Sequence, residues 1–167
     1  IDESNYTEEE GLISKAVDAF VNFDPIREMK KRGFFGNKET TILVENVQGE
    51  AHVSTRFSNV IIDKAKNVYA NLGSNVFVGN ALKISAEGNS TVKFNRVEEK
   101  AVATGGSYIE SMTDDRVPRL EVYGARAVIR SAERIDINRG SEAKINTATH
   151  GNIGSSNVLI GKVDGIL

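Results

Sequence analysis

A four-residue motif returns along this chain at a fixed interval. It reads Ser58-Asn59-Val60-Ile61, and related copies begin at Ser74, Ser90 and Ser156. The first three copies begin 16 residues apart, and the fourth begins 66 residues after the third, close to four further intervals. Recurrence at such an interval indicates a repeat architecture in which each period forms one structural unit. We therefore interpret each period as one coil of a β-solenoid.

Each period contains two short segments in which apolar residues alternate with polar ones, as they do in half-buried strands. The pairs that begin each period are Ile42/Val44, Val60/Ile62, Val76/Val78, Val92/Phe94, Leu120/Val122, Ile135/Ile137 and Val158/Ile160. The pairs in the second half are Ala51/Val53, Val68/Ala70, Ile84/Ala86, Ala101/Ala103, Ala127/Ile129 and Ala143/Ile145. Turn-forming residues, such as those at 63–66, separate the halves. A period therefore reads strand, turn, strand, turn.

A solenoid stacks its coils in parallel, whereas an antiparallel meander, sandwich or barrel reverses direction at each turn. The solenoid predicts that Asn59 lies beside Asn75, and that Val60 lies beside Val76, so that like side chains form columns. Hairpins would instead favour Asn-Gly or Asp-Gly turns, and the only such pair is at 164–165. We expect a mainly β protein, a single-stranded parallel β-solenoid of about seven short coils, with the antiparallel folds as the alternative.

The first 36 residues have a helical pattern instead. Thr7 and Glu10 fit a capping box, apolar residues follow at spacings of three and four, and Asp24-Pro25 begins a second helix. We predict helices at about 7–23 and 25–32, forming a cap (1–36) that covers one end of the solenoid (37–167) or lies along its wall. The period breaks once, which predicts an inserted loop near 104–118.

Composition excludes several classes of partner and site. Lys and Arg number 21 against 23 Asp and Glu, a net charge of −2 that gives no reason to expect nucleic acid. No apolar run approaches the roughly 18 residues of a membrane span, so we expect no membrane insertion. The absence of cysteine removes disulfides and thiol chemistry. The two histidines, His52 and His150, lie in no metal or triad motif, so we expect no catalytic residue, metal or cofactor.

Two groups of residues are candidates for binding. Strand alternation sends Ile61, Phe77 and Leu159 outward, and Ile166 and Leu167 are apolar residues beyond the last predicted strand. Large apolar side chains on an outer face are commonly covered by another chain, so we predict an interface there with a second copy or a neighbouring segment. In the predicted loop, a possible glycan-binding set comprises Tyr108, Asp114, Asp115 and Arg116.

These features predict a non-enzymatic structural or interaction module that self-associates within an elongated assembly. A phage tail component or a cell-surface adhesin would have this character, which places the protein on a virion or an extracellular surface. The first alternative is a module that binds or cleaves carbohydrate on the same scaffold. The second is a cytoskeletal solenoid that polymerises end to end, as bactofilins do, although a helical cap at one end argues against stacking at both.

Overall fold

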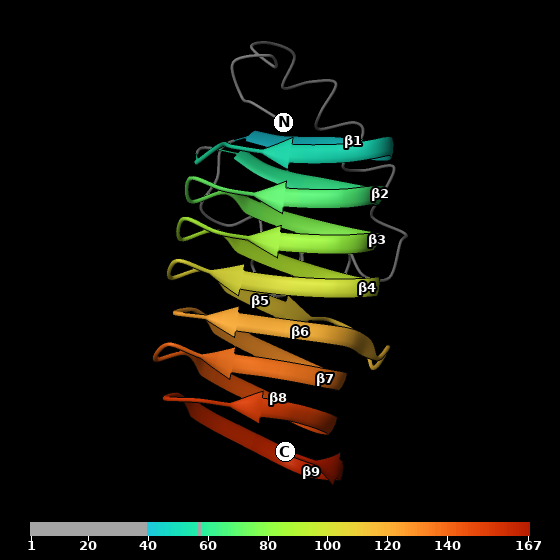
Figure 1. Ribbon diagram of the computed structural model, residues 1–167. Coiled ribbons are helices and arrows are strands. Elements are labelled where there is room, and N and C mark those ends of the chain that lie inside the picture. The colour runs from blue at the N-terminus through green and yellow to red at the C-terminus, as the bar shows by residue number, and fades with distance from the viewer. Residues whose placement is uncertain (1–39, 57) are drawn as a thin grey trace.

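A stack of parallel strands makes up the chain that the structure describes. The computed structural model describes residues 40–56 and 58–167, and Figure 1 shows their strands one above another. The predicted helical cap at 1–36 lies outside these residues, and within them there is no helix. The strands are β1 (Thr40–Val53), β2 (Ser58–Ala70), β3 (Asn75–Ala86), β4 (Thr91–Thr104), β5 (Tyr108–Ser111), β6 (Val117–Tyr123), β7 (Arg126–Asn138), β8 (Glu142–Ile153) and β9 (Asn157–Ile166).

All strand pairings are parallel, which confirms the predicted β-solenoid. Val60 pairs with Val76, and Val76 pairs with Val92, so valines of successive coils are direct neighbours. The solenoid has about eight turns rather than the predicted seven. The additional turn is the coil that β5 and β6 form together, since each of them pairs with β4 on one side and β7 on the other.

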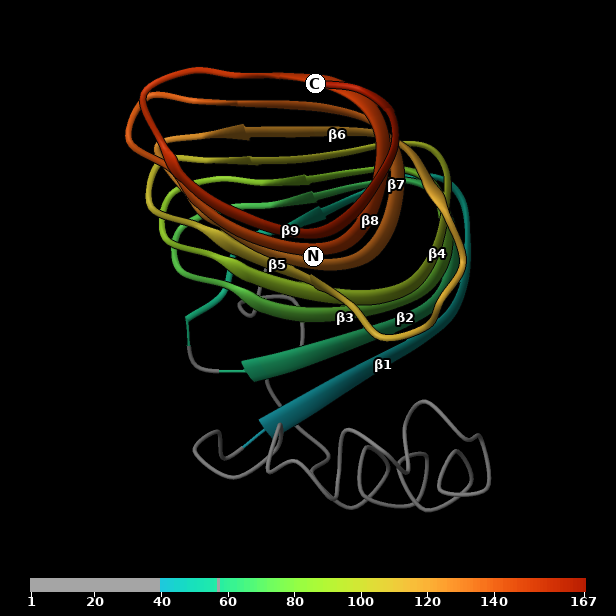
Figure 2. The ribbon, with the colours of Figure 1, turned by 90° about the horizontal axis from the view of Figure 1, so that it is seen from below.

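Most coils are formed by one long strand that curves around the axis, as the view along the stack shows (Figure 2). The predicted turn at 63–66 is wrong, because these residues continue β2. Parallel pairing persists through the bend, where Lys64 pairs with Asn80 and Ala65 with Ala81. The other coils bend within one strand, whereas the β5–β6 coil is interrupted by residues 112–116, so in most coils hydrogen bonding along the stack satisfies the backbone without a separate turn.

Two columns of inward side chains run along the interior. The first column belongs to the first half of each coil and contains Ile42, Val60, Val76, Val92, Ile109, Ala127, Ala143 and Val158. The second column belongs to the second half and contains Ala51, Val68, Ile84, Ala101, Leu120, Ile135 and Gly151. We call the outer surfaces of these halves the first wall and the second wall.

The predicted phase of the repeat, that is, which segment forms the first half of each coil and which the second, is wrong after residue 104. Leu120 and Ile135 were expected to begin periods but lie in the second column, whereas Ala127 and Ala143 lie in the first. The cause is β5, whose Ile109 begins a coil inside the segment predicted to be a loop. With β5 counted, the coils between Ser90 and Ser156 number four, as the spacing of the motif indicated.

The segment predicted as an insertion, 104–118, is therefore mostly part of the coil that β5 and β6 form. It contains β5 and the start of β6, and the segment between these two strands is 112–116. Gly105 and Gly106 have φ angles of 59° and 75° and form the turn before β5. Left-handed backbone of this kind favours glycine, and other coils turn in the same way, for example at Gly73 and Gly140.

The serine of the repeated motif forms a buried ladder at one corner of the coil. The amide of Ser74 donates to Oγ of Ser90 (3.1 Å), and the amide of Ser90 donates to Oγ of Ser107 (3.1 Å). The asparagines that follow are joined at one step, where Nδ2 of Asn75 donates to Oδ1 of Asn59 (2.7 Å). The serine side chains give buried backbone amides their partners, which explains why the motif begins with serine.

Candidate functional site

Ile61 and Phe77, two of the five predicted interface residues, do not lie on an exposed face. Ile61 and Phe77 are 2% and 1% exposed, whereas Leu159 is 64% exposed. The expectation that all three are exposed is wrong for Ile61 and Phe77. They nevertheless lie outside the interior core, in the outward row of the first wall that runs through Lys93 to Leu159. Strand alternation sets the direction of a side chain but not what packs against it.

Exposed apolar residues are concentrated at the last coil. Of the six large hydrophobic residues that are exposed in the described chain, five lie between residues 153 and 167, and the sixth is Leu72. The five are Ile153, Leu159, Val163, Ile166 and Leu167. Strand β9 pairs with β8 on one edge, and its other edge has no strand partner among the described residues. The predicted interface residues Leu159, Ile166 and Leu167 thus all belong to the last coil, with Leu159 on the first wall and Ile166 on the second.

The predicted ligand set is divided between two places. Tyr108 is on β5, where its hydroxyl lies 3.1 Å from Oε2 of Glu110 and the Arg126 guanidinium lies 5.7 Å from its ring centre. Asp114, Asp115 and Arg116 lie instead in the exposed segment between β5 and β6. These residues therefore do not form a single site.

The acids of that segment have weak polar contacts within the chain. The Asp114 carboxylate is 89% exposed and lies 3.6 Å from the Arg130 guanidinium, and Asp115 accepts a hydrogen bond from Thr113 Oγ1 (3.2 Å). In the described part of the chain, no three side chains of His, Asp or Glu gather as a metal site would require. Residues 40–56 and 58–167 also contain no helix that is long and apolar enough to cross a bilayer.

A continuous row of basic side chains follows the second wall, and we call it the basic column. It consists of Lys83, Lys100, Arg119, Arg134 and His150, one from each of five successive coils. Strand pairing joins Lys83 to Lys100, Arg119 to Arg134 and Arg134 to His150. The remaining step is bridged by Glu121, whose carboxylate lies 2.9 Å from Lys100 Nζ and 2.8 Å from Arg119 Nε.

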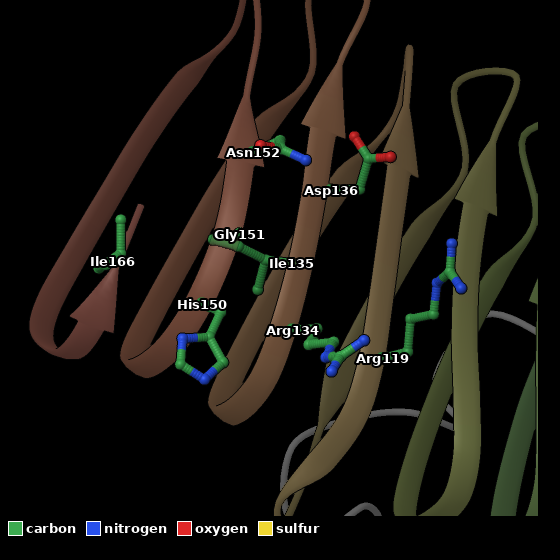
Figure 3. A pocket seen from close by; sticks show the side chains of 8 residues that line it. All are labelled: Arg119, Arg134, Ile135, Asp136, His150, Gly151, Asn152 and Ile166. Carbon is green, nitrogen blue, oxygen red and sulfur yellow. The ribbon is translucent and has the colours of Figure 1, made fainter.

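Two hollows lie along the basic column. The larger, of about 420 Å³, is lined by Arg119, Arg134, Ile135, Asp136, His150, Gly151, Asn152 and Ile166. Figure 3 shows that Arg134 and His150 project from neighbouring strands along one side of it, with Asp136 and Asn152 on the other. The smaller, of about 270 Å³, is lined by Tyr69, Lys83, Ile84, Ser85, Lys100 and Val102. The basic column and its two hollows therefore involve residues from β2 to β9.

Charge along the basic column is only partly neutralised. Lys83 pairs with the exposed Glu99 (3.4 Å), and Glu121 is shared between two cations. Arg134 is exposed and has no ion pair within the described chain. Beside it, Asp136 Oδ2 accepts a hydrogen bond from the Tyr123 hydroxyl (2.7 Å). Burial, this hydrogen bond and the nearby Glu121 carboxylate raise the pKa of Tyr123 to about 12.

The basic column was not predicted from the sequence. Its members are 15 to 19 residues apart and differ in type, so they do not stand out as copies of one motif. Three of them follow residue 104, where the predicted phase is wrong. With the correct phase, the basic residue just before each of Ile84, Ala101, Leu120, Ile135 and Gly151 would have revealed it.

Residues 40–56 and 58–167 form a parallel β-solenoid whose last coil exposes apolar side chains and whose second wall has the basic column. Compared with models of protein families, with curated proteins and with solved structures, the chain matches none of them.

Proposed function

We propose that this protein is a non-enzymatic structural module that self-associates through its last coil. The observation that carries the proposal is the concentration of exposed apolar side chains on and beside β9, at an edge that has no strand partner in the described chain. An unpaired strand edge offers a row of backbone donors and acceptors to another strand. The apolar residues around it add surface whose burial favours association.

A second copy of this chain is the partner whose charges best fit the free edge of β9. Lys162 and Asp164 of β9 form an ion pair of 2.9 Å, so they lie on the same side of the strand. If two copies of β9 paired antiparallel about Val163, residue 162 of each would lie opposite residue 164 of the other. The pairing would then be complementary in charge as well as apolar. A two-fold contact of this kind also closes the open edges of both copies at once.

Sedimentation equilibrium over a wide concentration range tests this proposal. We expect the wild-type protein to form dimers as concentration rises. Val163→Lys should weaken dimerisation by at least about tenfold, because the two-fold axis would bring the new charge close to its own copy. Val163 pairs with the buried Ala148 and is itself 41% exposed in the single chain, so a lysine there can reach solvent, and thermal unfolding of the variant checks that the fold is retained.

The matched control is Leu72→Lys, since Leu72 is the one exposed large hydrophobic residue of the described chain that lies far from β9 in the sequence. This variant removes a comparable apolar side chain and adds the same charge, and it should dimerise like the wild type. A wild-type protein that stays monomeric at all concentrations would overturn the proposal. Equal weakening by both substitutions would place the contact elsewhere and overturn it as well.

A further inference from the structure

We propose that the basic column binds a linear acidic polysaccharide that lies along the solenoid axis. The inference goes beyond self-association and depends on the basic column, whose five residues lie on the second wall and outside β9. The five basic residues occupy five successive coils. Successive coils are about 4.8 Å apart, so the column extends over roughly 19 Å. One coil step is close to the length of one sugar unit in an extended chain, so each coil can meet one sugar.

The form of the surface favours a chain rather than a small anion. Hollows lie at both ends of the basic column, one beside Lys83 and Lys100 and one beside Arg119, Arg134 and His150. A single carboxylate would occupy only one of them. A linear ligand parallel to the axis would contact both and would bring a negative group to several cations in turn.

The residues beside the basic column favour a sugar over a nucleic acid. Next to Arg119, Arg134 and His150 runs a second row that contains Glu121, Asp136 and Asn152. Asp136 accepts a hydrogen bond from the Tyr123 hydroxyl at Oδ2, and its Oδ1 has no protein partner in the described chain. The Asp136 carboxylate and the Asn152 amide oxygen can accept hydrogen bonds from sugar hydroxyls, which the backbone of single-stranded DNA lacks.

An aromatic ring completes the smaller hollow. Tyr69 lines it together with Lys83 and Lys100, and its ring stacks on that of His52 with centroids 4.8 Å apart. An amphipathic ring held in place by a neighbour provides a rigid apolar surface for one face of a sugar. The combination of cations, hydroxyl acceptors and an aromatic ring along one line therefore points to an acidic glycan.

Isothermal titration calorimetry with oligomers of polygalacturonate, at low and at higher salt, tests the inference. We expect binding that weakens as salt rises, because the contacts are between exposed charges. The fully methyl-esterified oligomer has the same sugar backbone without the carboxylates, and it should bind at least about tenfold more weakly. Single-stranded DNA of similar length should also bind more weakly, because its backbone has no hydroxyls to donate to Asp136 and Asn152.

Three substitutions locate the site. Arg134→Glu and, independently, Lys83→Glu should each weaken binding by about tenfold, since both side chains are exposed members of the basic column. Lys64→Glu makes the same charge change at an exposed lysine outside the column and should leave the affinity within about twofold. Thermal unfolding and sedimentation of each variant would show that fold and self-association are retained.

Several outcomes would overturn the inference. They are no binding at low salt, equal binding of the esterified oligomer or of DNA, and equal effects of Arg134→Glu and Lys64→Glu. Asp114→Ala is a further test, because Asp114 belongs to the segment in which the sequence predicted a glycan-binding set. Loss of binding on Asp114→Ala, with Arg134→Glu unaffected, would move the site to residues 112–116 and refute the basic column.

Discussion

Coil β3 and coil β9 contain related sequences but differ in burial. Val76 of β3 is 0% exposed and lies between Val60 and Val92. Val158 of β9 belongs to the same column, but in the described chain it has only Ala143 on one side and is half-buried. The difference shows that a coil gains its burial from both neighbours rather than from its own sequence. Stability in such an array is the sum of units and of the contacts between adjacent units.

Substitutions of isoleucine at one position of the coil would test this comparison most strongly. Ile62 and Ile160 both follow the motif in the fifth position, and Ile62 is 0% exposed while Ile160 is half-buried. We expect Ile62→Ala to lower the free energy of unfolding by about 2–5 kcal/mol, because it leaves a cavity between two coils. Ile160→Ala should cost less than about 2 kcal/mol, since solvent already reaches that site.

Urea denaturation of the two variants at low protein concentration, where β9 has no partner, measures both values. The comparison would be broken if Ile160→Ala destabilised the protein as much as Ile62→Ala does. That result would mean that a second neighbouring coil adds little to the stability that a buried isoleucine contributes.

The serine ladder provides a second, smaller contrast. Ser141 is 1% exposed, and its Oγ donates to the carbonyl of Val122 (3.0 Å) and accepts from the amide of Ala125 (3.4 Å). Ser141→Ala should therefore cost about 1–3 kcal/mol, the range for leaving buried polar groups without a partner. Ser156, in the equivalent place one coil later, is only half-buried, so Ser156→Ala should cost about 1 kcal/mol or less.

Thermal unfolding of the two serine variants side by side would test that order. A greater loss in Ser156→Ala than in Ser141→Ala would show that the corner hydrogen bonds matter most at the open end, contrary to the comparison.

Tyr123 supplies the smallest expected effect, and it concerns pH. Its pKa is raised from 10.0 to about 12, mainly by burial and by its hydrogen bond to Asp136. The folded protein thus holds this proton more tightly than the unfolded chain does. The resulting stability is complete below pH 10 and is lost as pH rises from 10 towards 12. Urea midpoints measured across this window should fall less steeply for Tyr123→Phe than for the wild type, and identical slopes would contradict the assignment.

Much of the fold could be predicted because like residues recur at one interval. The alignment of Val60, Val76 and Val92 followed from that interval, and so did the pairing of Asn59 with Asn75. The phase after residue 104 could not be predicted, because the β5 coil has Tyr108 where earlier coils have asparagine or threonine. Without that marker, a regular half-coil resembles an inserted loop.

The candidate sites were less predictable than the fold. Ile166 and Leu167 could be identified as exposed because they are apolar and follow the last predicted strand. The burial of Ile61 and Phe77 depends on tertiary packing that no local pattern encodes. The basic column depends on the register of five coils, so it cannot be recognised when the two halves of even one coil are assigned wrongly.

Disulfide cross-linking at Val163 tests most directly whether the last coil binds a second copy. The chain has no cysteine, so Val163→Cys introduces a single thiol. Directly opposed residues of an antiparallel pair have Cα atoms about 4.5–5.5 Å apart, within the range that a disulfide spans. Under mild oxidation we predict that Val163→Cys becomes a covalent dimer much faster than Leu72→Cys, as seen on non-reducing gels. Equal rates for the two variants would contradict a two-fold contact at β9.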